Sequence, residues 1–420
     1  MPPRPKAGNL KGMERQEFVD LMSPEGQALL GEVSYDNKTD VVKLVSRLRA
    51  EGHAPGLVAA VLTQAKLRKR AESKFGEFAA RMLFTEHGLE QASRLVVAAQ
   101  HAGRFRIAGV TQVADLGCGI GAESLAFAAA GLQVHAFELD EVTGAIATYN
   151  LLPFENAEVT QADVTNLDLS PNQAIFFDPA RRDLDGPKRS KAVRKFDPSE
   201  FSPNFDWVVE QCQSAGNPDR KLLAAGIKLG PGHPHEGIPD GCEAQWVSVG
   251  GDLVELALWF GTAARPGIAR SALLITADDQ HELKSVSTDG EHAPLGELKE
   301  YVFEPDNAVV RSHLIGELAA ATGLHCFSAG IAYLTGDNAV ESPWLKGFRV
   351  LEEMAFDRKK LKAKLRELGV GILEIKKRGA DIVPEQLRKE LDPKGKNKAT
   401  LIVTRVGEAH RVLICEALAG

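Results

Sequence analysis

The spacing of hydrophobic residues changes along the chain. From about residue 15 to residue 104, apolar residues recur every three or four positions, and Gly and Pro separate the segments. That period is typical of amphipathic helices. The segments are 16–33, 40–52, 56–84 and 88–105. The pattern predicts an N-terminal helical domain, to which we assign residues 1–107.

From about residue 108, strand-like apolar runs alternate with helical segments. This alternation predicts a parallel sheet with helices on both faces. The last two predicted strands, 243–249 and 253–261, are joined by Gly250-Gly251-Asp252, which is a hairpin signal. An NAD-binding fold would continue with another parallel crossover. We therefore predict a doubly wound α/β domain that ends in a hairpin, over residues 108–276.

The C-terminal part begins with a polar stretch, 277–298, which we interpret as a linker or long loop. Strand-like and helical segments then alternate on a smaller scale, for example a strand at 348–356 and a basic helix after it. This pattern predicts a compact α+β domain, to which we assign residues 295–420.

Composition sets broad limits on the class of protein. The chain has 420 residues, 44% hydrophobic and 25% charged, with a formal net charge of −7. These values are typical of a globular protein without an overall basic character. No apolar leader and no apolar run of 18 residues occur, so neither a signal peptide nor a membrane helix is predicted. The five cysteines form no CxxC pair, which favours a reducing cytoplasm and predicts no metal site.

The strongest chemical signal is the glycine motif VADLGCGIGAE, residues 113–123, between a buried strand and a helix. Glycines at such a turn let the backbone approach a ligand whose anionic group faces the helix N-terminus. Glu138 ends the second strand, where an acid can bind ribose hydroxyls, and Asp163 ends the third, within reach of an adenine amino group. From the residues alone, NAD or no ligand at all stays an alternative. Cys118, inside the motif, is expected to pack rather than to act as a nucleophile.

A second signal is the strand AIFFDPARR, residues 174–182. Asp178 stands at the end of the apolar run, and Pro179 fixes the backbone directly after it. That arrangement is typical of a deliberately placed carboxylate. The structural alternative is that Asp178 caps a helix or pairs with Arg181 or Arg182.

Together these motifs resemble the class I S-adenosylmethionine-dependent methyltransferases. DLGCGIG, the acid of the second strand and the acid of the third resemble their motifs I, II and III. The resemblance implies a seven-stranded Rossmann-like sheet. It also implies that S-adenosylmethionine is held by Asp115, Gly117, Gly119, Gly121, Glu138 and Asp163.

Within this class, the chain resembles a bacterial group that has a C-terminal THUMP-like domain. FFDPARR, EAQWVSVGGDLVELALWFG, the helical N-terminus with GLEQASR, and GILEIKKRGADIVPEQLRKEL with ATLIVTRV resemble this group over most of the chain. The group's substrate does not follow from these motifs. THUMP domains proper bind RNA, whereas a THUMP-like domain need not.

In amino-group methyltransferases the fourth strand ends in Asp/Asn-Pro-Pro-aromatic. Asp178 and Pro179 match this motif, but Ala180 and Arg181 replace the second proline and the aromatic residue. The resemblance implies that Asp178 accepts a hydrogen bond from the substrate amino group, while Arg181 could stack on a base or bind a phosphate. The candidate catalytic residues are therefore Asp178, Pro179 and Arg181. Methyltransferases of pyrimidine C5 need a cysteine after the next strand, and AGIKLGPG has none there.

Two segments carry local positive charge. Residues 181–195 hold seven Lys or Arg against two acids, and residues 345–405 hold seventeen against nine. Such asymmetry in an acidic chain suggests RNA as an anionic partner. The alternative for each segment is a solvated surface without a partner.

The sequence thus predicts an S-adenosylmethionine-dependent methyltransferase that modifies a nitrogen of an RNA base, with Asp178 orienting the acceptor. One alternative keeps the chemistry but gives it a protein or a small molecule as substrate. Another is an RNA-binding protein whose methyltransferase fold is inactive, because the second proline and the aromatic residue are missing. The sequence does not define the base, the RNA or the oligomeric state.

Overall fold

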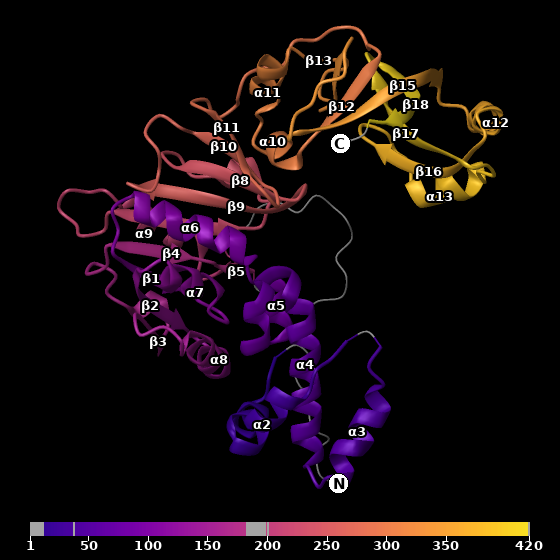
Figure 1. The fold of residues 1–420 in the computed structure, drawn as a ribbon. Helices are drawn as coiled ribbons and strands as arrows, with labels where there is room; N and C mark the ends of the chain where they lie inside the picture. The colour runs from indigo at the N-terminus through magenta and orange to yellow at the C-terminus, as the bar shows by residue number, and fades with distance from the viewer. Residues whose placement is uncertain (1–11, 37, 182–198, 200, 419–420) are drawn as a thin grey trace, which may run out of the picture. The chain divides into compact units, whose positions relative to one another are not determined.

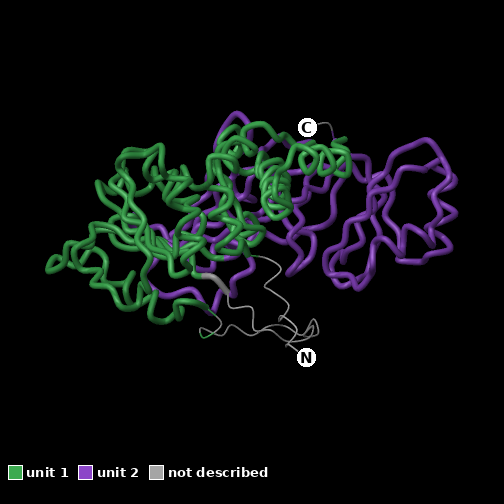
Figure 2. Tube along the Cα trace, turned by 90° about the horizontal axis from the view of Figure 1, so that it is seen from below, with its two compact units in different colours: residues 1–229, 259–264 green, residues 230–258, 265–420 purple. Residues whose placement is uncertain are grey.

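The computed structural model describes residues 12–36, 38–181, 199 and 201–418. The chain divides into two compact units (Figure 2), one formed by residues 1–229 with 259–264 and the other by 230–258 with 265–420. This division into two units does not test the three domains that the sequence predicts, so they stay a prediction.

Helices form the N-terminal part of the first unit, as the apolar spacing predicts (Figure 1). Two predicted helices are interrupted at breaker residues. Ser23 separates α1 from α2 and caps α2 by accepting a hydrogen bond from the Gly26 amide at 3.0 Å. Gly76, at φ +54°, ends α4 before a 3-10 turn. The helices are α1 Arg15–Met22, α2 Pro24–Glu32, α3 Val41–Ala50, α4 Pro55–Phe75, α5 Glu86–Gln91 and α6 Leu95–Ile107.

A nine-stranded sheet follows the helices, in the order β11-β10-β8-β9-β7-β4-β1-β2-β3. The strands are β1 Gln112–Leu116, β2 Gln133–Glu138, β3 Ala157–Gln161, β4 Ala174–Phe177, β7 Ala224–Leu229, β8 Glu243–Val249, β9 Asp252–Gly261, β10 Arg270–Ile275 and β11 Gln280–Ser285. Parallel pairing joins β1 to β2 and β4, β2 to β3, and β4 to β7. Gly250 and Gly251, both at positive φ, make the turn between β8 and β9, where a hairpin is predicted.

Seven of these strands are the predicted ones, and β10 and β11 extend the sheet. The polar stretch 277–298, predicted as a linker or loop, contains β11, which pairs antiparallel with β10. That part of the prediction is wrong because β11 is an edge strand of half-exposed polar residues without an apolar run. Strands β4 and β7 are fully buried, as parallel strands covered on both faces should be.

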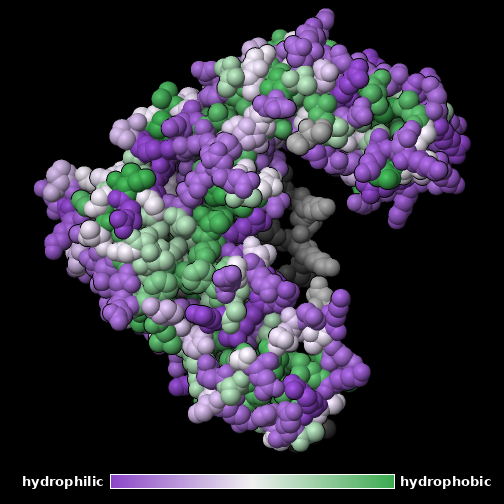
Figure 3. All heavy atoms as spheres, in the orientation of Figure 1, coloured by the Kyte–Doolittle hydropathy of each residue, from purple (hydrophilic) through white to green (hydrophobic). Residues whose placement is uncertain are grey.

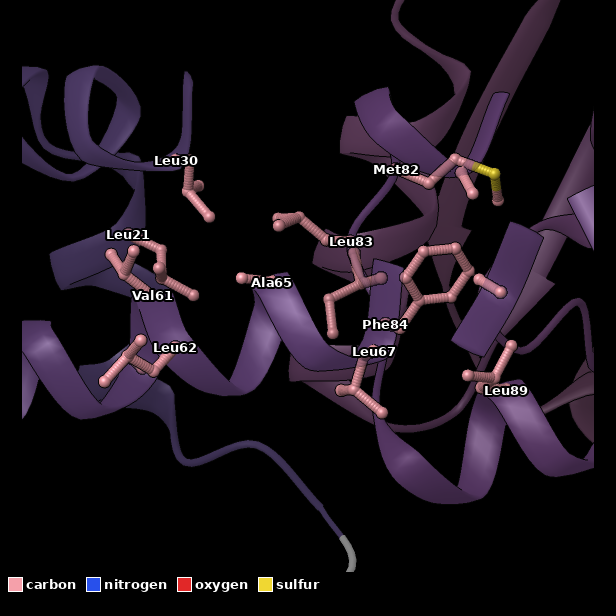
Figure 4. Packing of buried hydrophobic residues seen from close by; sticks show 14 of the residues in the cluster. Leu21, Leu30, Val61, Leu62, Ala65, Leu67, Met82, Leu83, Phe84 and Leu89 are labelled. Atoms are coloured by element: carbon pink, nitrogen blue, oxygen red, sulfur yellow. The ribbon is translucent and has the colours of Figure 1, made fainter. Parts of the chain in front are cut away.

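The helices of the first unit share one hydrophobic core with the glycine-motif region. Figure 4 shows the part of this core that the N-terminal segment contributes, from Leu21 to Leu89. Leu21, Val61 and Phe84 of the N-terminal segment belong to the same buried cluster as residues of α7 (Ala122–Ala129) and α8 (Glu141–Leu151). The buried side chain of Asn150 joins these parts, because it bonds both backbone groups of Leu83 and the carbonyl of Ile120. The N-terminal helices are therefore built into the wall of the glycine-motif region.

The second unit contains a seven-stranded sheet in the order β13-β14-β12-β15-β18-β17-β16. Its strands are β12 Tyr301–Pro305, β13 His325–Cys326, β14 Leu334–Gly336, β15 Leu345–Ala355, β16 Val370–Lys377, β17 Asn397–Val406 and β18 Ala409–Ala417. Helices α12 Arg358–Glu367 and α13 Pro384–Leu391 bury two leucines each, one turn apart, against the strands. The basic residues of RKKLKAKLREL therefore stand on the outer side of an amphipathic helix.

No helix of the described residues is long and apolar enough to cross a membrane.

Candidate functional site

A cavity of about 680 Å³ in the first unit opens at the carboxyl ends of β1, β2 and β4. Its lining includes six of the predicted site residues, namely Asp115, Gly117, Gly119, Glu138, Asp163 and Asp178. The predicted residues Gly121 and Pro179 lie next to the lining in the chain. Ligands of doubly wound folds bind at this edge.

The glycine motif makes a turn that only glycine adopts without strain. Gly117, Gly119 and Gly121 have φ values of +86°, +56° and +84°. At Gly117 and Gly119, a Cβ atom would meet nothing within 4 Å, so the loop surface faces open space. Gly121 instead lies against α8, where a Cβ would be 3.5 Å from Ala147. The first two glycines thus leave room for a ligand, and the third allows the loop to pack closely against α8.

Asp115 is completely buried at the end of β1. Burial raises the pKa of Asp115 to about 7, and the hydrogen bond from Ser124 offsets part of that rise. Ser124 donates to Oδ2 at 2.5 Å, whereas Oδ1 is buried without a hydrogen-bond partner among the described residues. A buried carboxylate oxygen without a donor is costly, so this atom fits a ligand that brings a donor or a positive charge.

Glu138 and Asp163 both present oxygen atoms to the cavity. Each carboxylate oxygen of Glu138 accepts one backbone hydrogen bond, from Gly119 at 3.0 Å and Asp140 at 2.9 Å. Since such an oxygen can accept two, Glu138 keeps capacity for ligand hydroxyls. The hydroxyl and amide of Thr165 lower the pKa of the exposed Asp163 carboxyl and hold it in place.

Asp178 forms an ion pair with Lys228, which lies on the neighbouring strand. The Lys228 ammonium is 2.5 Å from Asp178 Oδ2 and donates to the Gln91 carbonyl at 2.9 Å. The side chain of Lys228 is 11% exposed and that of Asp178 is 31% exposed. The register of β4 and β7 pairs Phe177 with Ile227, so the next residues, the acid and the lysine, are neighbours across the strands.

Residues of the N-terminal helical segment complete the cavity wall. Thr85, His87, Gln91 and Ser93 line it. Lys74 of α4 fixes this segment by donating to three of its carbonyl groups, those of Leu89, Glu90 and Ala92. Burial, and then the nearby charges of Lys228 and Arg94, lower the pKa of Lys74 to about 8.

A buried contact between a histidine and a glutamate lies beside the cavity, whose lining includes the glutamate, Glu123. His101 of α6 and Glu123 of α7 are 2.9 Å apart, and both are almost fully buried. Burial alone would raise the pKa of Glu123, but His101, Lys228 and Ser93 outweigh it and lower that pKa. The imidazole also packs against Phe176 and Trp259.

Sequence reasoning missed Lys228 and the wall formed by residues 85–93. A signal for Lys228 was present, because a lysine inside the buried run AAGIKL requires a partner for its charge. The wall had no such signal, since only tertiary packing brings it to the sheet. Burial raises the pKa of Cys118 well above its ordinary value, so its thiol is protonated, consistent with a packing role.

Two sequence predictions lie partly or wholly outside the described structure. The backbone of Arg181 pairs with Phe201 in a two-stranded ribbon. The rest of the basic segment up to residue 195 lies outside the described residues. Among the residues that are described, no group of three or more His, Cys, Asp or Glu could hold a metal ion.

The fold and the cavity define a class I methyltransferase, and relatives identify the family. Two uncharacterized S-adenosylmethionine-dependent methyltransferases from strains of Mycobacterium tuberculosis are each 32% identical over 371 residues, which cover 86% of this chain and 95% of each relative. The chain therefore belongs to this family of S-adenosylmethionine-dependent methyltransferases.

Other comparisons agree with the fold and the domain content. The crystal structure of a proposed methyltransferase from Porphyromonas gingivalis matches with a TM-score of 0.70 and 20% identity, covering 92% of this chain and all of that one. The family model "THUMP domain-like" matches residues 345–417. A second family model, "Domain of unknown function (DUF8688)", matches residues 14–71.

The cavity residues fit S-adenosylmethionine. Buried Asp115 Oδ1 has no donor among the described residues, and the cofactor carries two positively charged groups. Gly117 and Gly119 leave open space beside the helix N-terminus, and Glu138 has acceptor capacity for the ribose hydroxyls. These features are those that the class I resemblance implies.

Proposed function

We propose that this methyltransferase modifies a nitrogen atom of an RNA base and that Asp178 orients the acceptor. The observation that carries the proposal is the carboxylate of Asp178 at the end of β4, on the lining of the same cavity as the glycine motif. An acid at that position can accept a hydrogen bond from an amino group beside the cofactor site.

In this proposal each acid has a separate task. Asp115, Glu138 and Asp163 hold S-adenosylmethionine together with the three glycines of the motif. The bound cofactor supplies a methyl group on a positively charged sulfur. Asp178 accepts a hydrogen bond from the substrate amino group and stabilises the positive charge that develops on the nitrogen as the new bond forms. Pro179 directs the backbone away after the acid, and Arg181 contacts the base or its phosphate.

Two observations support RNA as the substrate. The THUMP domain-like match, residues 345–417, includes the basic segment 345–405 and strands β15 to β18. Several cations of residues 345–405 form local ion pairs, such as Lys364 with Glu352 and Arg358 with Glu390. Within residues 345–405, eight exposed cations have no ion pair among the described residues, namely Lys359, Lys360, Arg366, Lys377, Arg388, Lys389, Lys396 and Lys398. Hydrophilic residues cover much of the surface of α12 and α13 in the view of Figure 3.

The unpaired cations should contribute most of the salt-dependent RNA affinity of this domain. We expect the variant with Lys359, Lys360, Lys396 and Lys398 all changed to Gln to bind RNA more weakly. The slope of log affinity against log salt should fall by about 0.7 for each RNA phosphate that the variant no longer neutralises. Filter binding of total RNA at several salt concentrations measures this slope.

A matched control is Lys364→Gln, which removes a cation that is paired with Glu352 and Glu367. It should leave the slope unchanged. An unchanged slope in the quadruple variant would mean that these lysines form a solvated surface and that RNA binds elsewhere or not at all.

The raised pKa of Asp115 predicts proton release on cofactor binding. Because burial raises the pKa of Asp115 to about 7, part of the Asp115 population carries a proton near pH 7. A cationic ligand favours the ionised form, so binding should release protons near pH 7. Affinity should therefore rise as the pH rises through 7. Calorimetry in buffers of different ionisation enthalpy measures the release, and Asp115→Asn should abolish it. The same release from the Asn variant would assign it to another group.

The proposal is tested by supplying methyl-tritiated S-adenosylmethionine and a lysate of cells that lack this protein. We expect tritium in material that is sensitive to ribonuclease and resistant to protease. Label that is removed only by protease, or that stays in small molecules, would identify another substrate class. No transfer would support an inactive fold. The cytoplasmic location stays a prediction from cysteine usage.

A further inference from the structure

The lysine next to Asp178 is the buried charged group that sequence reasoning did not assign. Lys228 lies on β7, one residue beyond the last pair that β7 makes with β4, and Asp178 lies one residue beyond the same pair on β4. The two side chains therefore stand side by side at the ligand edge of the sheet. Both line the cavity.

Burial gives this ion pair a larger desolvation cost than an ion pair on the surface has. The ammonium is 2.5 Å from the carboxylate, and only 11% of the lysine side chain is exposed. An ammonium taken out of water is destabilising unless its charge is compensated and its hydrogen bonds are made. The carboxylate supplies the compensation, and it is in turn held in one position by the lysine.

A second hydrogen bond connects the Lys228–Asp178 pair to the N-terminal helical segment. Lys228 also donates to the carbonyl of Gln91, in the segment that forms the cavity wall. The same ammonium thus joins the end of β4 to that wall. Since Lys74 fixes this wall segment through three carbonyls, the position of Lys228 is defined from two sides.

The sequence around Asp178 explains why such support matters. The motif has one proline, Pro179, and Ala180 stands where amino-group methyltransferases have a second. A single proline restrains the backbone on only one side of the alanine. A catalytic carboxylate needs support from residues that lock its rotamer.

We propose that Lys228 is a positioning residue of the methyl-transfer site, whose ammonium fixes the Asp178 carboxylate against the acceptor amino group. This inference rests on the proposed role of Asp178. Lys228 also keeps the carboxylate in its ionised, hydrogen-bond-accepting form, because a neighbouring positive charge favours that form. It acts through Asp178, so its contribution disappears when the acid is absent.

A double-mutant cycle tests this dependence. The proteins are the parent chain, Asp178→Asn, Lys228→Met and the double variant. Single-turnover transfer of tritium from S-adenosylmethionine to a lysate of cells lacking this protein is the rate measured, with calorimetry of cofactor binding on each variant. We expect Lys228→Met to lower the rate at least tenfold, with cofactor affinity within about twofold of the parent. The double variant should be no slower than the slower single variant.

Two further variants separate positioning from folding. Lys228→Arg keeps a cation and should recover part of the rate that Lys228→Met loses. Lys69→Met removes a half-exposed lysine that pairs with Glu72, and it should transfer methyl groups at the parent rate. If Lys228→Met loses cofactor affinity and melting temperature together with its rate, the lysine is only structural and the inference is wrong.

The remaining outcomes distinguish the inference from the proposed function. Additive losses in the double variant, or a parent rate in Lys228→Met beside a slow Asp178→Asn, would overturn the inference and leave the role of Asp178 standing. A parent rate in Asp178→Asn, or no transfer by the parent chain, would overturn both.

Discussion

Asp178→Ala should lower the single-turnover rate of methyl transfer by about 100-fold or more, the loss typical of removing one preorganised polar contact. Because we propose that Asp115, Glu138 and Asp163 bind the cofactor, the affinity for S-adenosylmethionine should stay near the parent value. The rate is measured on the RNA that takes up label in the tritium experiment. The large effect is expected because the carboxylate lies at the end of a fully buried strand.

The ion pair with Lys228 requires a second variant as control, since Asp178→Ala leaves a buried ammonium without its carboxylate. Asp178→Asn keeps the size of the side chain and an oxygen acceptor. It should fold as the parent does and still transfer methyl groups slowly. If the alanine variant folds and reaches the parent rate, the acid is structural and the catalytic interpretation of FFDPARR is wrong.

Glu138→Ala should weaken S-adenosylmethionine binding by about tenfold or more, because in the proposed site it removes charge-assisted hydrogen bonds to the two ribose hydroxyls, worth roughly 1.5–3 kcal/mol. The variant also removes the acceptor for the Gly119 and Asp140 amides. Calorimetry measures the affinity.

Glu138→Gln is the matched control for the loss of the hydrogen bonds that hold the loop around Gly119. It keeps an oxygen that can accept from one of the two amides but lacks the negative charge. An affinity between those of the parent and the alanine variant is expected. Parent-like affinity in a folded Glu138→Ala protein would remove Glu138 from the cofactor site.

The sequence predicts those strands of the fold that are buried and therefore consist of consecutive apolar residues. AIFF and AAGIKL are wholly buried, and their apolar residues alone predict strands. Strand β11, QHELKS, reads as a loop in the sequence, because an edge strand with half-exposed residues gains its structure from pairing with β10 rather than from burial. The breaks at Ser23 and Gly76 show that capping and positive φ divide helices whose apolar period continues.

The candidate site is predictable where it follows the ends of consecutive strands. The parallel register brings Asp115, Glu138 and Asp178 to one edge, so counting strands is enough to place them together. Lys228 and the wall at residues 85–93 depend on the packing of the N-terminal helices, which no local pattern encodes. The buried lysine signals that a partner exists but not which carboxylate it is.

The most direct test of the central claim is to identify the methylated atom. RNA from cells lacking this protein is treated with the parent enzyme and S-adenosylmethionine, digested to nucleosides and separated by chromatography with mass spectrometry. We predict one new nucleoside with a methyl group on a base nitrogen, which forms much more slowly when Asp178→Asn replaces the parent. A methyl group on carbon or ribose oxygen, or equal product from both proteins, would contradict the account.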